Sequence, residues 1–375
     1  MNSVIALVIA TAIPLIFLYI VYTQDLYRTG AFFYVIFCFI WGGIAYELAA
    51  QINPATVNFK LISFDNMLRF SAPIVEEILK GTILLYLIRR ANFNYFVDGA
   101  IYGFAIGIGF AIFENYEYVL SRPDAALMLA IGRVLSTNLV HATGSATIGI
   151  GLGIARFDRS SRRLLVLFSS LAIAIGLHMA FNNLVTRVNS NLQLLYAAGI
   201  GFAGAAFIVT VIHRGLREEK SWIEEKLGAT DRVTMGETAI VNRLRDVQDI
   251  LSPVAQRFGP QKADEIEKFL TIQAQLGIKR KILEKVQAQD GNSSETLEAE
   301  IEQLRTRMDE ARRSVGAYCM LYLRNIFPED TSPLWGRLQT IVQERVASGT
   351  PSDGPSLWSS LNDRIRQPNP PTNET

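Results

Sequence analysis

The feature that most constrains this chain is a series of apolar segments that fills its first 213 residues. A helix needs about 20 mostly apolar residues to cross a bilayer, where its backbone polar groups must be satisfied internally. Seven segments come close to this length: 3–22, 31–50, 70–88, 97–120, 127–154, 164–186 and 192–213. We therefore expect an all-α fold, a polytopic transmembrane helix bundle with about seven crossings over residues 1–213.

Arginines indicate the orientation of this bundle, because Lys and Arg collect in cytoplasmic loops. Arg89 and Arg90 end the third segment, and further arginines follow the fifth segment in the loop 156–163. This pattern predicts a multi-pass protein of the plasma membrane with its N-terminus outside and its C-terminal domain in the cytoplasm. Arg133 interrupts the fifth segment, so we expect that crossing to begin after it.

The remainder of the chain has a different composition. Of the 36 Lys and Arg residues 23 lie in 214–375, as do 25 of the 35 Asp and Glu residues. Apolar residues over 240–254 and 297–322 alternate steps of four and three, which is coiled-coil spacing. We expect 214–365 to be a cytosolic helical, partly coiled-coil domain that can form a homo-oligomer, and the proline-containing end, 366–375, to be a disordered tail. A net charge of +1 gives no reason to expect nucleic acid as a partner.

Ionisable side chains in the apolar segments are the strongest functional signal. Each costs a few kcal/mol at membrane depth and therefore needs a partner, a cavity or a role in function. Glu76, Glu77 and Lys80 share the third segment, and Lys80 is spaced to reach either acid along one helix side. One carboxylate can thus be ion-paired while its neighbour takes and returns a proton.

Three more segments carry polar residues at membrane depth: Glu114 in the fourth, His141 in the fifth, and His178 with Asn182 in the sixth. An imidazole can pass a proton or bind a metal, and an asparagine can donate to a developing oxyanion. An ion pair that fixes packing, or a histidine that only makes a hydrogen bond, would explain any one of them. Their occurrence on four separate segments favours a common functional site.

These residues resemble the motifs of the PrsW intramembrane proteases, distant relatives of the CAAX prenyl endopeptidases and bacteriocin-processing enzymes. The matching patterns are Glu-Glu-x-x-Lys at 76–80, Phe-x-x-x-Glu at 110–114, His-Ala-Thr-Gly at 141–144 and His-x-x-x-Asn at 178–182. The resemblance covers roughly residues 30–210 and does not extend to 214–375. It implies hydrolysis of a peptide bond in a membrane-anchored protein substrate, in or near the lipid bilayer.

The resemblance also implies roles for single residues. Glu76, with Glu77 beside it, would activate water, and which of the two is the base stays open, with Glu76 preferred. His178 and Asn182 would stabilise the oxyanion, and Glu114 takes the position where the CAAX relatives carry a histidine. His141 would be an additional polar group, with Lys80 and Asn115 in support.

The cofactor stays open between two descriptions of the family, glutamate-dependent and metal-dependent. We expect no cofactor, because each ligand would come from a different segment and Lys80 would compete with a cation. The alternative is a zinc protease with Glu77, Glu114, His141 and His178 as ligands. Other hypotheses are a proton-coupled transporter, and a non-catalytic membrane scaffold whose function lies in its coiled coil.

Overall fold

The computed structural model describes residues 2–90, 93–158, 160, 162–187, 190–228, 231, 233–244, 247–288 and 294–323. The chain divides into two compact units, one formed mainly by residues 1–218 and the other mainly by residues 219–375. The regular elements in the described part are all helical. The expected tail at 366–375 and the segment 324–365 lie outside the described residues.

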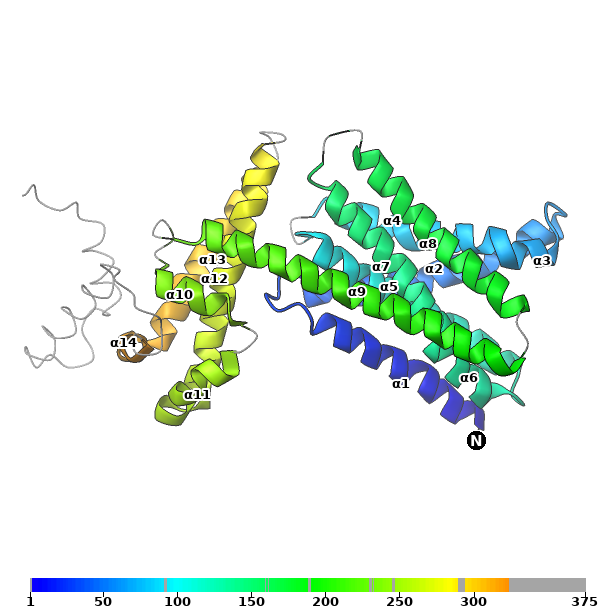
Figure 1. The fold of residues 1–375 in the computed structure, drawn as a ribbon, viewed down its shortest axis with the longest axis horizontal. Helices are drawn as coiled ribbons and strands as arrows, with labels where there is room; N and C mark the ends of the chain where they lie inside the picture. Colours follow the sequence, from blue (N-terminus) through cyan, green and yellow to red (C-terminus); the bar gives the residue numbers. More distant parts are fainter. Residues whose placement is uncertain are drawn as a thin grey trace, which may run out of the picture. The chain divides into compact units, whose positions relative to one another are not determined.

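The first unit contains the apolar segments (Figure 1). Its elements are α1 (Asn2–Tyr22), α2 (Phe32–Asn58), α3 (Phe64–Asn66), the π-helical turn η1 (Met67–Ser71), α4 (Ala72–Leu87), α5 (Phe96–Ser121), α6 (Ala126–Leu135), α7 (Thr137–Ala155), α8 (Arg162–Arg187) and α9 (Ser190–Lys226), whose last residues belong to the second unit.

Within the described residues, six helices are long and apolar enough to cross a membrane: 2–22, 32–58, 96–121, 126–155, 162–185 and 192–226. The all-α fold of a multi-pass membrane protein is thereby confirmed. The expected crossing at 70–88 is not among them. α3, η1 and α4 run on without a break from Phe64 to Leu87, and this helical segment carries the charged residues Glu76, Glu77 and Lys80. The expected interruption near Arg133 takes the form of a break at Ser136, between α6 and α7.

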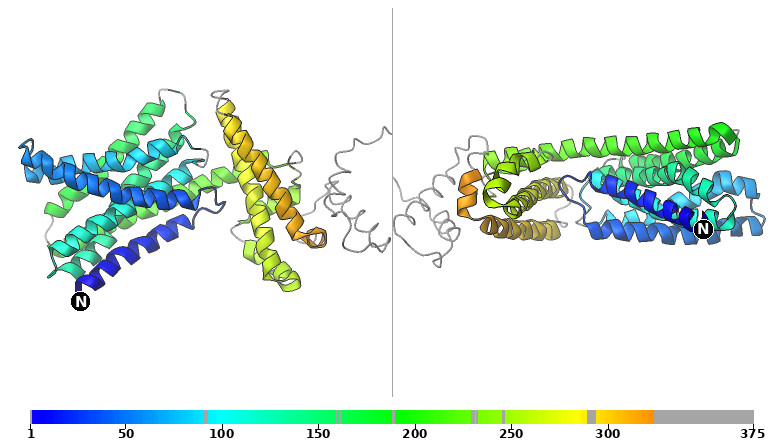
Figure 2. Two further views of the ribbon diagram at one scale, coloured as in Figure 1. Left: turned by 180° about the vertical axis from the view of Figure 1, so that it is seen from behind. Right: turned by 90° about the horizontal axis from the view of Figure 1, so that it is seen from below.

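Helix α5 forms the core of the first unit, since 94% of its most apolar stretch is buried. It packs against α1, α2, α6 and α7 (Figures 1 and 2). Gly99, Gly103 and Gly107 recur every four residues on the side of α5 that faces α7. Their lack of a side chain lets the two backbones approach closely, as small residues do in membrane helices.

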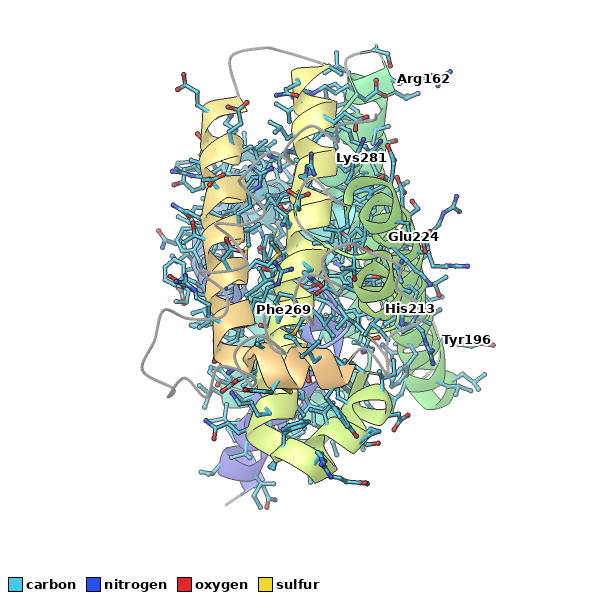
Figure 3. The ribbon with its side chains drawn as sticks, turned by 90° about the vertical axis from the view of Figure 1, so that its left-hand side faces the viewer. Arg162, Tyr196, His213, Glu224, Phe269 and Lys281 are labelled. Carbon is cyan, nitrogen blue, oxygen red and sulfur yellow. The ribbon has the colours of Figure 1, made fainter. Side chains whose placement is uncertain are left out.

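The second unit contains α10 (Met235–Val241), α11 (Val247–Phe258), α12 (Pro260–Gln287), α13 (Ser294–Val315) and α14 (Ala317–Leu323). Helix α12 contacts α10, α11 and α13, and Figure 3 shows α12 and α13 side by side. Lys279 on α12 pairs with Glu300 on α13 at 2.7 Å.

The apolar stripes of the second unit are interrupted in two places. The residues of the 240–254 stripe fall on two helices, because α10 ends at Val241 and α11 begins at Val247. Gly316, at φ +84°, follows the last residue of α13 in the left-handed conformation that commonly ends a helix, and Tyr318 beyond it is 62% exposed. The coiled coil stays a prediction.

The contact between α5 and α7 generates a stability prediction. A Cβ on Gly103 would lie 2.2 Å from the backbone oxygen of Ser145, whereas a Cβ on Gly176 of α8 would meet nothing within 4 Å. We expect Gly103→Ala to lower the free energy of unfolding by about 1–3 kcal/mol through overpacking, and the control Gly176→Ala to leave it unchanged or slightly higher. Thermal melts of both variants in detergent check this. Equal melting temperatures for the two variants would contradict the close approach of α5 and α7.

Candidate active site within the helix bundle

A buried ion pair on α4 connects three helices of the first unit. Lys80 Nζ donates to Glu77 Oε1 at 2.5 Å, and both side chains are almost completely buried. The same Lys80 Nζ lies 3.1 Å from His141 Nδ1 on α7, and the same Glu77 Oε1 lies 3.0 Å from His178 Nδ1 on α8. The two histidine rings meet edge to face, 4.7 Å between centroids. The pair therefore contacts both membrane histidines of the predicted site.

The tautomer of His141 follows from its partners. A lysine ammonium has donors only, so His141 Nδ1 must accept from Lys80. The ring is then neutral and carries its hydrogen on Nε2, which donates to Glu114 Oε2 at 2.8 Å. Both ring nitrogens of His141 are thus engaged, one with Lys80 and the other with Glu114.

His178 has the opposite arrangement. Its Nδ1 faces the Glu77 carboxylate, which is ion-paired with Lys80 and only accepts, so Nδ1 donates. In a neutral ring, Nε2 then presents a lone pair, and it lies 3.8 Å from Glu76 Oε2. A carboxylate behind a histidine fixes the ring and raises its basicity.

The neighbouring acids Glu76 and Glu77 have different surroundings. The side chain of Glu77 is 1% exposed and lies among Lys80, His178 and the backbone of α7 near Gly144. The side chain of Glu76 is 13% exposed, accepts a hydrogen bond from Asn53 Nδ2 at 3.1 Å, and faces His178 Nε2. Successive helix positions point about 100° apart, so one acid is enclosed while the other faces the cavity described below.

Glu114 on α5 is held by a second set of polar groups. Arg133 Nη2 on α6 lies 2.7 Å from Glu114 Oε2, and Arg133 Nε donates to Asn115 Oδ1 at 2.7 Å. Asn115 in turn donates to Asn138 Oδ1 on α7 at 2.9 Å. Glu114 thereby accepts a hydrogen bond from His141 Nε2 and is ion-paired with Arg133.

The π-helical turn η1 has a local cause in Pro73. The Ala72 amide donates to Met67 O, five residues back, and in this register the carbonyl of Leu68 would need the amide of residue 73. Proline has no N–H, so that donor is missing. Asn182 Nδ2 of α8 supplies it at 2.9 Å. Asn182 therefore ties α8 to the turn that leads into Glu76, and π-helical turns of this kind are frequent at functional sites.

A cavity of about 600 Å³ lies against these groups. It is lined by Glu76, Glu114, Arg133, His141, His178 and Asn182, and by the surrounding residues Leu68, Arg69, Ala72, Tyr118, Met128, Leu129, Gly132, Ser136, Thr137, Phe181, Val185, Gln193, Leu194 and Ala197. Two of these, Met128 on α6 and Leu194 on α9, are also 70% and 39% exposed. The cavity therefore extends from the polar cluster to the surface of the unit between α6 and α9.

The structure brings the residues singled out in the sequence to one place. Glu76, Glu77, Lys80, Glu114, Asn115, His141 and His178 belong to the polar cluster through the contacts above, and Asn182 lines the same cavity. Glu77 and Lys80 lie behind the cavity wall and do not line it. Three members were missed in the sequence: Asn53, Arg133 and Asn138.

The missed residues carried weak signals. Asn53 lies beyond the expected end of the second segment, because α2 continues through Pro54 to Asn58, although proline usually disrupts a helix. Arg133 was visible as a charge inside an apolar segment, but charge alone does not distinguish an interfacial arginine from a buried one. Asn138 had no signal beyond its polarity.

Three of the cluster residues could hold a metal ion. Ligand atoms of Glu76, His141 and His178 lie within 4.8 Å of one another. The set expected from the sequence contained Glu77 and Glu114 in place of Glu76. In the structure, Glu77 is ion-paired with Lys80 and hydrogen-bonded to His178 Nδ1, whereas Glu76 faces the opposite side of the His178 ring at Nε2.

Comparisons with known proteins match the part of the chain that carries the polar cluster. Residues 31–212 match the sequence profile of a family described as PrsW family intramembrane metalloprotease. The chain is 32% identical over 114 residues to Protease PrsW of Clostridioides difficile (strain 630), and 31% identical over 121 residues to Protease PrsW of Bacillus subtilis (strain 168). These alignments cover 30% and 32% of this chain.

The chain spans about half the length of these two relatives, 48% and 54%. A longer alignment, to Protease PrsW of Shouchella clausii (strain KSM-K16), is 25% identical over 206 residues and covers 52% of this chain and 88% of the relative. No solved structure matches. The region that carries the polar cluster and its cavity, residues 31–212, is thus similar to the PrsW family of intramembrane proteases.

Proposed function

We propose that this chain is an intramembrane endopeptidase that hydrolyses a membrane-anchored protein substrate with a water activated by Glu76. The observation that carries the proposal is the placement of Glu76. It lies in the wall of a cavity inside an apolar bundle, opposite a histidine nitrogen with a lone pair. A carboxylate and an imidazole on either side of one water are a standard arrangement for general-base catalysis.

The first step forms the tetrahedral intermediate. Glu76 takes one proton from the water, the water oxygen bonds to the carbonyl carbon of the substrate, and the carbonyl electron pair moves onto its oxygen. In the second step the carbonyl reforms, the bond from carbon to nitrogen breaks, and the proton on Glu76 passes to the leaving nitrogen. The products are one new carboxyl terminus and one new amino terminus, and Glu76 is regenerated.

His178 and Asn182 act beside Glu76 in this proposal. Because Nδ1 of His178 donates to Glu77, its Nε2 accepts the second hydrogen of the attacking water and orients it. This differs from the role that the resemblance implied, in which His178 stabilises the oxyanion. Asn182 keeps the role of donor to the oxyanion and lines the cavity next to His178.

Glu77 and Lys80 position the reacting groups and do not touch the substrate. Their ion pair fixes His178 through Glu77 and His141 through Lys80. Lys80 and Glu77 also compensate each other's charge. The negative charge of Glu76 is therefore not repelled by an unpaired Glu77 carboxylate beside it. His141, Glu114 and Asn115 form the opposite side of the site.

The shape of the cavity supports a substrate held in the membrane. The cavity reaches the surface of the unit at apolar side chains, Met128 and Leu194, which a bilayer would cover. A membrane-anchored segment can enter there without leaving lipid, and its polar backbone is bound only at the cluster. The proposal keeps the plasma membrane as location, with the N-terminus outside and the C-terminal domain in the cytoplasm.

The residues fit a metal ion only in part. Glu76 and His178 Nε2 are suitable ligands, and Glu77 behind His178 is the usual type of supporting group. His141 does not fit, because a metal on its Nε2 would require a hydrogen on Nδ1, and Lys80 occupies Nδ1 with a donor. A metal would therefore have to displace Lys80 or convert the ring to an anion. We propose that the enzyme works without a metal.

The first prediction separates the two glutamates. We expect Glu76→Gln to lower kcat by about 10²–10⁴-fold, the usual size of a general-base contribution, while the protein keeps its melting temperature. Glu77→Gln should also reduce cleavage, but with a clear drop in melting temperature, because it leaves Lys80 as a buried unpaired charge at a cost of about 3–5 kcal/mol.

The substrate for this comparison is found by mass spectrometry of new protein termini in membranes that contain wild-type protein or Glu76→Gln. Cleavage that appears only with the wild type supports the proposal, and the cleaved single-span protein then serves in reconstituted assays. Undiminished cleavage by Glu76→Gln would sink the proposed mechanism.

The second prediction concerns metal. We expect cleavage by the purified enzyme to persist after dialysis against 1,10-phenanthroline, with less than stoichiometric zinc in the active protein by elemental analysis. The physical reason is the Lys80 ammonium at His141. Loss of activity on dialysis that zinc restores would refute the metal-free mechanism and leave the peptidase assignment intact.

A further inference from the structure

Arg133 is a mostly buried cation to which the mechanism above gives no task. Its side chain is 13% exposed and lies near the end of α6, one turn before the break at Ser136. Arginine inside a membrane protein is expensive and usually marks function. It lines the same cavity as Glu76, His178 and Asn182.

Helix α5 holds Arg133 in a defined position. Its guanidinium is paired with Glu114, and its Nε donates to Asn115 Oδ1. It also stacks on the ring of Tyr118, with 3.9 Å between the guanidinium carbon and the ring centroid. These three residues lie within one turn of α5 and form a single surface. The guanidinium is thus preorganised, which is the condition for efficient stabilisation of a charge that develops during reaction.

The contact with Glu114 does not use the hydrogens of Nη2 fully. Arg133 Nη2 lies 2.7 Å from Glu114 Oε2, but the angles are not those of a hydrogen bond, and no other described residue accepts from Nη2. A guanidinium has five N–H donors in a fixed planar fork. The side chain therefore brings a positive charge to the wall of the cavity, while Nη2 itself is enclosed beside Glu114.

Charge compensation points to the same residue. The proposed first step removes a negative charge from Glu76 and creates one on the substrate oxygen. Asn182 can offer the oxyanion only a neutral hydrogen bond, and one of its amide hydrogens already goes to Leu68 O. The two arginines of the cavity wall are Arg69, which pairs with the exposed Asp65, and Arg133, which contacts the polar cluster.

We propose that Arg133 is a catalytic residue that donates a hydrogen bond from its guanidinium to the oxyanion of the tetrahedral intermediate. The inference rests on the proposed peptidase function and deepens it. No bond to Arg133 forms or breaks: the oxyanion receives the carbonyl electron pair, the guanidinium stabilises it, and the interaction weakens when the carbonyl reforms. Glu114 orients Arg133 between turnovers and offsets its charge.

The test uses the full-length enzyme and the single-span protein cleaved by the wild type. We expect Arg133→Gln to lower kcat by about 10²–10³-fold, as loss of an oxyanion donor does elsewhere, with KM changed by less than about threefold, since the interaction belongs to the transition state. Guanidinium ion at millimolar concentration should restore part of the kcat of Arg133→Ala. A residue with a purely structural role would not show this rescue.

Arg156→Gln is the matched control. Arg156 lies in the same unit, stacks on Phe157 and does not line the cavity, so this variant should keep its kcat. If the neutral Arg133 variants do not fold, Arg133→Lys tests the proposal instead. We expect this variant to fold and to have a kcat about tenfold lower, because a lysine ammonium does not reproduce the planar set of guanidinium N–H donors.

Three results would overturn the inference: Arg133→Gln with a kcat near that of the wild type, a folded Arg133→Ala that guanidinium does not restore, or Arg133→Lys with full kcat. In each case cleavage by the wild type and its loss in Glu76→Gln would still support the peptidase. Absence of cleavage by the wild type, in contrast, would remove the proposed function itself.

Discussion

The ion pair between Lys80 and Glu77 is the interaction on which the rest of the polar cluster depends. Two charges without access to water are stable only when each has its partner and further hydrogen bonds. Here those further bonds go to His141 and His178, which come from two other helices. The pair therefore fixes the tautomers of both rings and holds α4, α7 and α8 in one arrangement. Few other contacts in the first unit determine the chemistry of so many side chains.

This arrangement divides the work between two adjacent glutamates. Glu77 is enclosed, and its carboxylate serves the protein by orienting a histidine. Glu76, one helix position away, faces the cavity and lies opposite the other nitrogen of that histidine. The two side chains point in different directions because successive helix residues are rotated by about 100°. The π-helical turn η1 directly precedes the helix α4 that carries both acids. Asn182, which binds the carbonyl left without a partner by Pro73, connects the same turn to α8. In the proposed mechanism, the motif Glu-Glu-x-x-Lys thus contains one base and one ion pair and not two equivalent acids.

The other side of the site is organised by a second ion pair. The resemblance implies that Glu114 replaces a histidine of the CAAX relatives, and this exchange adds a negative charge. In this chain Arg133 lies beside Glu114, with Asn115 and Asn138 in support. The pairing offsets the charge of Glu114 and places a guanidinium in the wall of the cavity, where we propose that it meets the substrate carbonyl. His141 connects the two sides, since one of its nitrogens faces Lys80 and the other faces Glu114.

The sequence was enough to predict the helical membrane fold, the approximate positions of the long helices, and the candidate site residues on α4, α5, α7 and α8. It could do so because apolar length and ionisable residues at membrane depth are properties of single segments. The tertiary structure was needed to decide which glutamate faces the cavity, which partner each histidine nitrogen meets, and that Asn53, Arg133 and Asn138 belong to the cluster. The π-helical turn before α4 and the continuation of α2 through Pro54 were likewise decided there. These facts depend on helix rotation and on contacts between segments far apart in the chain, and residue spacing within one segment does not specify them.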